Sequence, residues 1–314
     1  MIPTFTQQEK LQRCVKSVLD QSMPDLEVIV VNNGGSPVAL ATNLRGFSDP
    51  RLRVAHLDKN SFFCAPVNHG VSISSTPYIA TLNDDAWLDV DWAKNVVSTF
   101  EENVEIGSVS SLVLQAENPD RVDSAGNHVD LLGRASNLLW NEASSRVSDT
   151  LVPVFSASSS CAAYRRDAWN AAGGLDNDFT AYFEDIDLGF RMQLLGMPCL
   201  LNPRCRTYHH GASTSTAPKY KSFLIERNRV WNIVKNFPTP LLKGHALPLV
   251  LSNLLPVTLQ NGRSVHTLVT GKSAAVVGIH KMLQKRIGIQ RSRRIPLSSL
   301  EALLSPNSSR MCKL

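Results

Sequence analysis

The sequence has no closely spaced cysteine pair and no long apolar run. None of its six cysteines forms a C-x-x-C pair, which argues against a zinc ribbon or a thioredoxin-like motif. The most apolar stretch, residues 246–259, is shorter than the ~20 residues that span a bilayer and contains Pro248, Asn253 and Pro256. No secretory signal follows Met1. We therefore expect a cytoplasmic protein with reduced, buried thiols that does not cross a membrane.

Acidic residues are scarce in the last third of the chain. After residue 203 there are 18 Lys or Arg residues but only two acidic ones, whereas residues 1–203 hold 25 acidic and 14 basic residues. This split indicates an acidic body and a tail that meets polyanions. The whole chain has 314 residues, 43% of them hydrophobic, which excludes a disordered protein and suffices for one large α/β domain or two ordinary ones.

Short apolar runs alternate with helical patterns up to about residue 115. Strands are predicted at 26–31, 52–56, 78–82 and 106–114. Strands interleaved with helices indicate an α/β fold with a mostly parallel central sheet, and ligands of such sheets bind beyond the carboxyl ends of the strands. Asn32 and Asp85 both fall at such ends.

The first candidate motif is Asn83-Asp84-Asp85, directly after a predicted strand. Adjacent carboxylates repel one another and need water or a cation, and hard oxygen ligands suit Mg²⁺ or Mn²⁺. The same three residues are also typical of a turn or a helix cap, and for the motif alone this interpretation is favoured.

The second motif begins a predicted helix whose apolar face contains Phe183, Ile186 and Phe190. Glu184, Asp185 and Asp187 then lie in its first turn, where the helix dipole favours anions, so we expect all three to be ionised near neutrality. An ionised carboxylate in a cleft can take the proton of an attacking hydroxyl. Alone, the segment is explained as well by an ordinary acidic helix start.

Three more residues are candidates for binding a metal or a phosphate. His209 and His210 could complete a metal shell beside carboxylates, although a single histidine is usually structural. Arg227 has the forked donors that suit phosphate, and its alternative is a solvated helix face.

In their order and spacing these segments resemble the family 2 glycosyltransferases of the GT-A fold, especially the rhamnosyltransferase-like branch. The resemblance covers roughly residues 2–235, about three quarters of the chain. The matching segments are 2–5, 27–34, 60–70, 82–85, 173–188, His209 and Arg227-Asn228.

The resemblance implies a nucleotide-diphosphate sugar bound at the strand ends, with Mn²⁺ or Mg²⁺ clamping the diphosphate. A hydroxyl of a glycan or lipid-linked acceptor displaces the diphosphate with inversion, in cell-surface polysaccharide synthesis; rhamnose is the best guess for the sugar. Asp185 is then similar to the catalytic base, with Glu184 beside it. Asp85 and His209 look like the metal ligands, with His210 as the alternative to His209.

Further donor contacts follow from the same resemblance: Pro3, Thr4, Asn32, Asn68, Asp84 and Arg227, the last facing the diphosphate. The implied regions are a nucleotide-sugar-binding half at 1–119, an acceptor-binding and catalytic half at 120–235, and a basic helical extension at 236–314. The two acidic motifs should face each other across one cleft.

Three departures from the family pattern stand out. Asn32 replaces the usual Asp, and Asn83 replaces the first acid of a D-x-D pattern. Only Met1 and Ile2 precede Pro3, where the family has a longer central strand, and each ladder group left unpaired and buried costs about 1–3 kcal/mol. We expect the true start to lie upstream.

Two other functions stay open at this point. A sugar-nucleotidyltransferase also joins an α/β sheet to a metal-bound acidic pair, but Asn33-Gly34-Gly35-Ser36 is too short for its Gly-rich phosphate loop and lacks the basic residue. A nucleotide-sugar-binding relic without activity is the non-enzyme alternative.

The basic tail has two interpretations. Its densest part, residues 281–294, contains six Lys or Arg residues and no acid. It fits either contact with an anionic membrane surface, where the enzyme would be peripheral, or a solvated helix face. Nucleic acid is not expected, because residues 270–314 lack Phe, Tyr and Trp.

Overall fold

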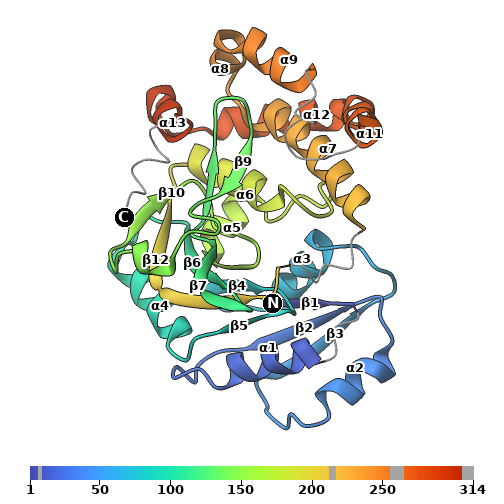
Figure 1. The fold of residues 1–314 in the computed structure, drawn as a ribbon, viewed down its shortest axis with the longest axis vertical. Helices are drawn as coiled ribbons and strands as arrows, with labels where there is room; N and C mark the ends of the chain where they lie inside the picture. Colours follow the sequence, from blue (N-terminus) through green and yellow to red (C-terminus); the bar gives the residue numbers. More distant parts are fainter. Residues whose placement is uncertain (6–8, 212–216, 255–264, 306–314) are drawn as a thin grey trace.

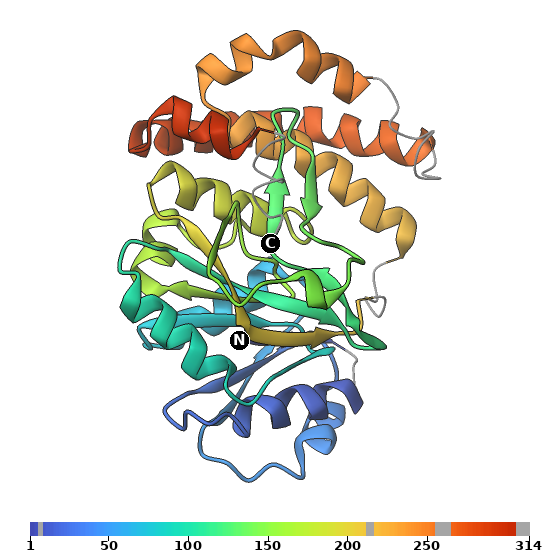
Figure 2. The same ribbon diagram turned by 60° about the vertical axis from the view of Figure 1, so that its left-hand side comes forward.

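The computed structural model describes residues 1–5, 9–211, 217–254 and 265–305. Two sheets form the centre of the molecule, and a layer of C-terminal helices lies on one side of them (Figures 1 and 2). The helices are α1 (Glu9–Leu19), α2 (Pro37–Leu44), α3 (Cys64–Ser72), α4 (Trp92–Glu102), α5 (Arg166–Ala172), α6 (Glu184–Leu194), α7 (Pro218–Asn236), α8 (Thr239–Gly244), α9 (Ala246–Leu254), α11 (Val265–Val277), α12 (Ile279–Ser292) and α13 (Leu297–Leu303), besides a 3₁₀ turn at Ser144–Arg146.

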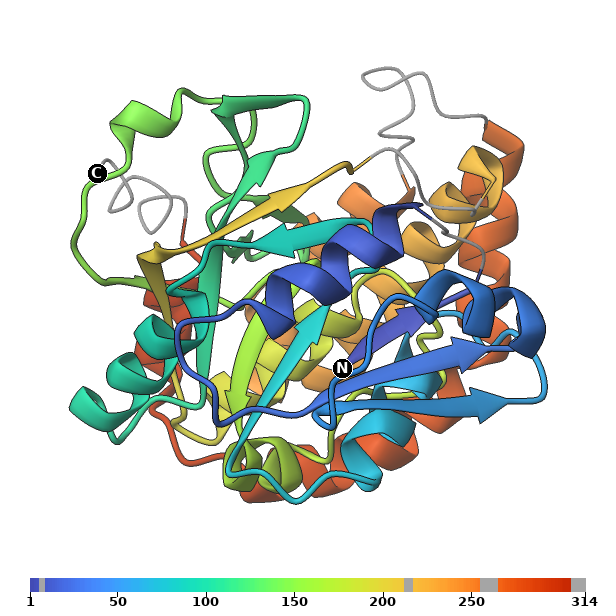
Figure 3. The ribbon, with the colours of Figure 1, turned by 90° about the horizontal axis from the view of Figure 1, so that it is seen from below.

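The first sheet is parallel and consists of β1 (Ile2–Thr4), β2 (Val28–Asn33) and β3 (Leu52–Leu57), with β2 in the middle. Every residue of β2 is buried, as its continuous apolar run predicts for a strand covered on both faces. Helix α1 packs against both β2 and β5, across the junction of the two sheets (Figure 3).

The second sheet has seven strands in the order β10-β12-β6-β11-β4, with β5 beside β12 and β7 beside β6. Its members are β4 (Tyr78–Leu82), β5 (Ala86–Leu88), β6 (Ser108–Gln115), β7 (Asn118–Ser124), β10 (Val152–Val154), β11 (Cys161–Arg165) and β12 (Cys199–His209). A separate hairpin, β8 (Asn127–Val129) with β9 (Ala135–Asn137), rises toward the C-terminal helices (Figure 1).

The expected α/β fold is confirmed, but the expectation of mostly parallel strands is wrong for the seven-stranded sheet. Only β6 and β12 pair in parallel there. The loop from β6 to β7 has two residues, and such a short connection can only join antiparallel strands. Strand β11 then runs antiparallel to both β4 and β6.

Strand β1 is short and still satisfies its neighbours. Thr4 pairs with Asn32 of β2. On the other side the Met1 amino group donates to the Ala80 carbonyl at 2.7 Å, and the Leu82 amide donates to the Met1 carbonyl at 3.1 Å. The ladder groups of β4 that face β1 are therefore paired, and the cost expected from a shortened strand is avoided at these positions.

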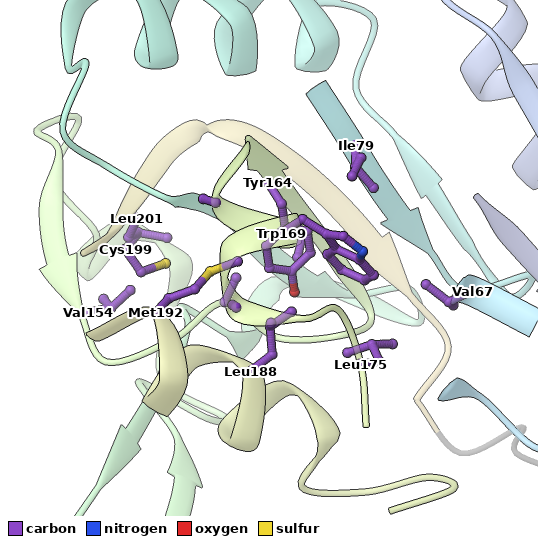
Figure 4. Packing of buried hydrophobic residues seen from close by; sticks show 14 of the residues in the cluster. Val67, Ile79, Val154, Tyr164, Trp169, Leu175, Leu188, Met192, Cys199 and Leu201 are labelled. Atoms are coloured by element: carbon purple, nitrogen blue, oxygen red, sulfur yellow. The ribbon is translucent and has the colours of Figure 1, made fainter. Parts of the chain in front are cut away.

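Helix α6 is fixed by an apolar cluster beneath it. Leu188 and Met192 of α6 pack against Tyr164 and Trp169, whose rings meet edge-on at 5.2 Å (Figure 4). This packing holds the first turn of α6, which carries the second acidic motif.

The region after α7 contains only helices among the elements that the structure describes. Within the described ranges no helix combines the length and apolarity needed to cross a bilayer. Five of the six cysteines are buried and form no disulfide: Cys14, Cys64, Cys161, Cys199 and Cys205. The sixth, Cys312, lies outside the described residues.

Candidate active site

A cavity of about 1160 Å³ opens where β1 and β4 end and α6 begins. Both acidic motifs line it: Asp84 and Asp85 on one wall, Glu184 and Asp185 on another. Pro3 and Thr4 line it as well. The structure thus brings together the two motifs that the sequence predicts to share a cleft.

The first motif is tied to strand β12 through His209. Strand β12 pairs with β5, so that His209 lies opposite Ala86. Nε2 of His209 is 3.2 Å from Oδ1 of Asp85, and Nδ1 is 2.9 Å from Oδ2 of Asp123. Burial alone would lower the pKa of His209, but its hydrogen bonds to Asp123 and Asp85 outweigh this and raise it to about 9.

This arrangement fits a divalent cation. Without a cation, the raised pKa keeps both ring nitrogens of His209 protonated at neutrality, toward Asp123 and Asp85. A cation would replace the proton on Nε2 while Nδ1–H still donates to Asp123, and a histidine oriented by a carboxylate is the usual metal-binding arrangement. The 3.2 Å between Nε2 and Oδ1 is close to the spacing of about 3 Å between neighbouring ligands of a six-coordinate Mg²⁺. Mg²⁺ and Mn²⁺ accept this mixture of carboxylate and imidazole ligands.

Over the described ranges, no group of three or more His, Cys, Asp or Glu residues is arranged to hold an ion. The remaining ligand positions would therefore belong to substrate phosphates and water, as is common for Mg²⁺. His210 is directed elsewhere, because its Nδ1 lies 2.6 Å from Oε1 of Glu117.

Asp84 belongs to the same wall but has a different environment. Burial raises its pKa to about 6, although the Thr4 hydroxyl donates a hydrogen bond of 2.7 Å to its Oδ2. The bond joins the end of β1 to the motif after β4.

Asp185 is held by three donors at the start of α6. Its Oδ2 accepts from Asn127 Nδ2 at 3.1 Å and from the Ser159 amide at 3.2 Å, and its Oδ1 accepts from the Ile186 amide at 2.8 Å. Burial raises the pKa of Asp185 and outweighs the opposing effect of these hydrogen bonds. The result is a fixed carboxylate with increased basicity on the cavity wall.

Glu184 corrects one expectation. Burial, reinforced by the neighbouring charge of Asp185, raises its pKa to about 8, so it is protonated rather than ionised at neutrality. Its Oε2 has no hydrogen-bond partner among the described residues. The helix dipole is outweighed here because the side chain is only 5% exposed.

Arg227 is placed differently from its predicted role toward the diphosphate. It does not line the cavity; its Nη2 donates to the carbonyls of Asp178 and Phe179 at 3.1 and 3.0 Å. The neighbouring Asn228 donates to the carbonyls of Phe179, Ala181 and Tyr182 at 2.6–2.9 Å. The sequence pattern of α7 does not reveal these contacts, because they depend on how α7 packs against the loop before α6.

Asn32 and Asn68 also hold the backbone. Asn32 lines a second pocket of about 310 Å³ that shares Thr4 with the main cavity. Its amide group accepts from the Gly35 amide and donates to the Gly35 carbonyl, both at 2.9 Å. Asn68 lies outside both pockets and bonds to the backbone of Leu175 and to Asn177.

Sequence reasoning missed three residues that touch the predicted site: Asp123, Asn127 and Ser159. Asp123 lies on β7 and Asn127 on β8, strands that the sequence pattern did not indicate. Each is a single polar residue without a local motif, so only the tertiary fold reveals it.

Comparisons with known proteins show which family and which solved structures this chain resembles. The family model of glycosyl transferase family 2 matches residues 1–171, which include Asp85 but not Asp185 or His209. Among curated relatives, the O-antigen biosynthesis protein RfbC of Myxococcus xanthus is 26% identical over 225 residues. That match covers 69% of this chain and 17% of RfbC, so the chain spans about a sixth of that relative.

Two solved glycosyltransferase structures share the fold. GalNAc-T7 with UDP, GalNAc and Mn²⁺ superimposes with a TM-score of 0.63 at 11% identity, covering 91% of this chain and 56% of that one. The mannosyltransferase PcManGT from Pyrobaculum calidifontis, in complex with GDP-Man and Mn²⁺, gives 0.54 at 14% identity, covering 93% and 84%. Both are GT-A glycosyltransferases, so this chain has the GT-A fold.

Proposed function

Because the chain belongs to glycosyl transferase family 2, we propose that it moves a sugar from a nucleotide-diphosphate donor to a hydroxyl of a glycan or lipid-linked acceptor. We also propose that it acts in cell-surface polysaccharide synthesis, as the name of the Myxococcus relative suggests. The observation that carries the proposal is the shared cavity, lined by both Asp85 and Asp185. A candidate base and a candidate cation site in one cavity suit the displacement of a diphosphate by an alcohol.

Asp185 acts as the base in this proposal. The proton of the acceptor hydroxyl moves to Asp185 as the acceptor oxygen forms its bond to the anomeric carbon. The bond from that carbon to the diphosphate oxygen breaks on the opposite face, so the configuration inverts. The three hydrogen bonds from Asn127, Ser159 and Ile186 support this role because they fix the carboxylate before the acceptor arrives.

Asp85 and His209 would hold Mn²⁺ or Mg²⁺, with Asp123 orienting the imidazole. When bound, the cation supplies positive charge for the departing diphosphate. Pro3, Thr4 and Asp84 would contact the donor in the main cavity, with the nucleoside reaching toward the second pocket beside Asn32. Rhamnose is our proposal for the sugar, from the resemblance to that branch alone.

One assay separates this function from its rivals. The protein is incubated with Mn²⁺ and a panel of nucleotide sugars, and free nucleoside diphosphate is measured. Its release supports glycosyl transfer or donor hydrolysis. Release of pyrophosphate from a nucleoside triphosphate would instead support a nucleotidyltransferase, and release of neither product would support a binding relic.

We also propose peripheral attachment to the cytoplasmic face of an anionic membrane. Fewer residues of the basic cluster at 281–294 would contact lipid than the sequence suggests, because several of them bind within the protein. Lys281 and Lys285 pair with Asp178, and Arg286 donates to the carbonyls of Val234 and Phe237. Of the basic cluster at 281–294, the exposed cations that would face lipid are Arg291 and Arg294. Deleting 281–294 would therefore disturb the fold, and charge reversal at these two arginines is the better test in liposome sedimentation.

A further inference from the structure

We infer that Trp140 is a stacking platform for a neutral sugar ring of the acceptor, an inference that rests on the proposed glycosyltransferase function. Trp140 lines the main cavity and its side chain is 64% exposed, although large aromatic side chains are normally well buried. None of the ring contacts formed by the described residues involves Trp140. Its apolar faces are thus available to a ligand in the cavity.

The backbone on both sides of Trp140 has an unusual conformation, and the Trp140 side chain stays exposed. The residues on both sides, Leu139 and Asn141, have φ values of 57° and 61°, in the left-handed region that side chains rarely adopt. Such strain persists where surrounding contacts enforce it, and it concentrates at ligand sites. Here the Asn141 amide donates to the Val122 carbonyl at 2.8 Å, and the buried Leu138 anchors the turn from below.

Trp140 belongs to the wall that touches the candidate base. The segment from β7 to the turn at 139–142 also carries Asn127, which donates to Asp185. The donor contacts proposed above, Thr4 and Asp84, come from β1 and the end of β4 instead. We therefore assign a ligand lying on Trp140 to the acceptor, whose hydroxyl Asp185 would deprotonate in our proposal.

The lining of the cavity favours a neutral, polar-edged ring as that ligand. Six of the described lining residues are Asp or Glu, and all but Glu184 can carry a negative charge at neutrality. Lys221 and the protonated His209 oppose them, so negative charge prevails and disfavours an anionic acceptor group at this wall. The exposed Ser136 and Asn137 lie close to Trp140 in sequence and line the cavity too, so they offer hydrogen bonds to ring hydroxyls. One face of a pyranose carries C–H groups that pack on an indole.

The size of the cavity allows this second ligand. Sites for single small molecules usually enclose about 300–1,000 Å³. The main cavity measures about 1160 Å³, without the adjoining pocket of about 310 Å³ beside Asn32. A donor and at least one acceptor sugar can therefore be present together.

The test compares Trp140→Ala with Trp140→Tyr, which keeps an aromatic face. Leu151→Ala is the matched control, because it truncates an exposed apolar side chain in the same region that does not line the cavity. Transfer is measured with Mn²⁺, the preferred nucleotide sugar and methyl glycosides of common hexoses as acceptors. Donor hydrolysis without acceptor is followed in parallel, and circular dichroism checks folding.

For Trp140→Ala we expect the acceptor KM to rise about ten-fold, with a much smaller change in kcat and in donor hydrolysis. Trp140→Tyr should recover most of the affinity, and Leu151→Ala should match the unmodified protein. Saturation-transfer NMR with the same glycosides, in the presence of nucleoside diphosphate and Mn²⁺, should show ring protons in contact with the protein and lose the signal in Trp140→Ala.

An unchanged acceptor KM in Trp140→Ala overturns the inference while leaving the proposed function intact. The same holds if the protein hydrolyses its donor but shows neither transfer nor saturation transfer with any glycoside. If no nucleotide sugar is consumed at all, the proposed function fails first, and the inference falls with it.

Discussion

The carboxylates in the first turn of α6 differ because their neighbours differ. Asp187 is fully buried, yet Arg191 and Lys235 outweigh the effect of burial and lower its pKa. Burial and the neighbouring charge of Asp185 raise the pKa of Glu184, which lines the cavity and has no such cation to oppose them. Burial also raises the pKa of Asp185, which lines the cavity. The three acids of one helical turn therefore have three different electrostatic environments.

Replacing Asp185 by Asn tests its role as the base. The variant keeps the size of the side chain but cannot take a proton, so turnover should fall by about 10²–10⁴-fold. Donor affinity should stay nearly intact, because Asp185 faces the acceptor in our proposal. Steady-state transfer and calorimetric titration with nucleoside diphosphate and Mn²⁺ measure the two quantities. Near-normal turnover would show that another group is the base.

Glu184 should leave a signature in the pH dependence of stability. The unfolded chain releases this proton near its ordinary pKa of about 4.3, whereas the folded protein keeps it up to about pH 8. The folded state binds more protons in between, so its stability falls as the pH rises through this range. Glu184→Gln removes the effect and should gain stability relative to the unmodified protein by up to about 1.4 kcal/mol per pH unit.

Urea unfolding at several pH values from about 5.5 to 8.5 measures this difference. Glu101→Gln, at an exposed position of α4, serves as control and should run parallel to the unmodified protein. A parallel curve for Glu184→Gln would show that Glu184 is ionised in the fold.

The loop between α5 and α6 is the element on which the site depends. Thr180, Tyr182 and Phe183 all have positive φ, so its backbone is strained just before Asp185. Arg227 and Asn228 of α7 bind its carbonyls from one side, and the amides of Phe63 and Cys64 bind the Thr180 carbonyl from another. These contacts hold the loop in a conformation it would not keep alone.

Asn228→Ala should therefore reduce catalysis more than binding. The carbonyls of Ala181 and Tyr182 lose their Asn228 donor, and that of Phe179 is left with Arg227. Asp185 then loses its fixed position, and we expect kcat to fall by about ten-fold or more with little change in donor KM. The free energy of unfolding should drop by about 1–3 kcal/mol. Asn95→Ala is the matched control, since Asn95 also donates to a backbone carbonyl, that of Arg204 in β12, away from the cavity. Equal losses of kcat in both variants would contradict a positioning role.

The sequence pattern predicted those elements whose apolar residues recur at a regular spacing along the chain. It did not predict elements that are buried only by contacts with residues distant in sequence. The strand at 78–82 was predicted with its observed bounds, and the apolar face of α6 was predicted correctly. Strands β10 and β11 were not predicted, since they are short and owe their burial to neighbours distant in sequence. Asp123 was missed for the same reason, whereas Asp84 and Asp85 stand in a motif beside a clear strand.

At the scale of the whole molecule, a partly buried cluster of ion pairs joins the helices α7 and α12 to α6 and to the loop before it. Lys235 of α7 lies 2.7 Å from both Asp176 and Asp187. Lys285 of α12 lies 2.5 Å from Asp176 and 2.7 Å from Asp178. The charge asymmetry read from the sequence is thus partly an internal complementarity: basic residues of the late helices neutralise acids of the body.

Lys285→Met tests whether the ion pairs of Lys285 with Asp176 and Asp178 stabilise the fold. The variant keeps an apolar stem of similar length but leaves Asp176 and Asp178 without one of their cations, so the free energy of unfolding should fall by about 1–3 kcal/mol. Lys281→Met is the control, because Lys281 is half exposed and 3.4 Å from Asp178, and it should cost less than about 0.5 kcal/mol. Urea unfolding measures both. A loss for Lys281→Met as large as that for Lys285→Met would argue against the cluster.

The position of β12 has a consequence for how the chain is made. Among the strands in the described part of the chain, β12 is the last to be synthesised; it lies between β10 and β6 and also pairs with β5. As the nascent chain leaves the ribosome, β6 keeps an open edge until residue 209 has emerged, and open edges invite aggregation. Expression of residues 1–171 alone, the part that the family model matches, should therefore yield inclusion bodies rather than a free-standing module.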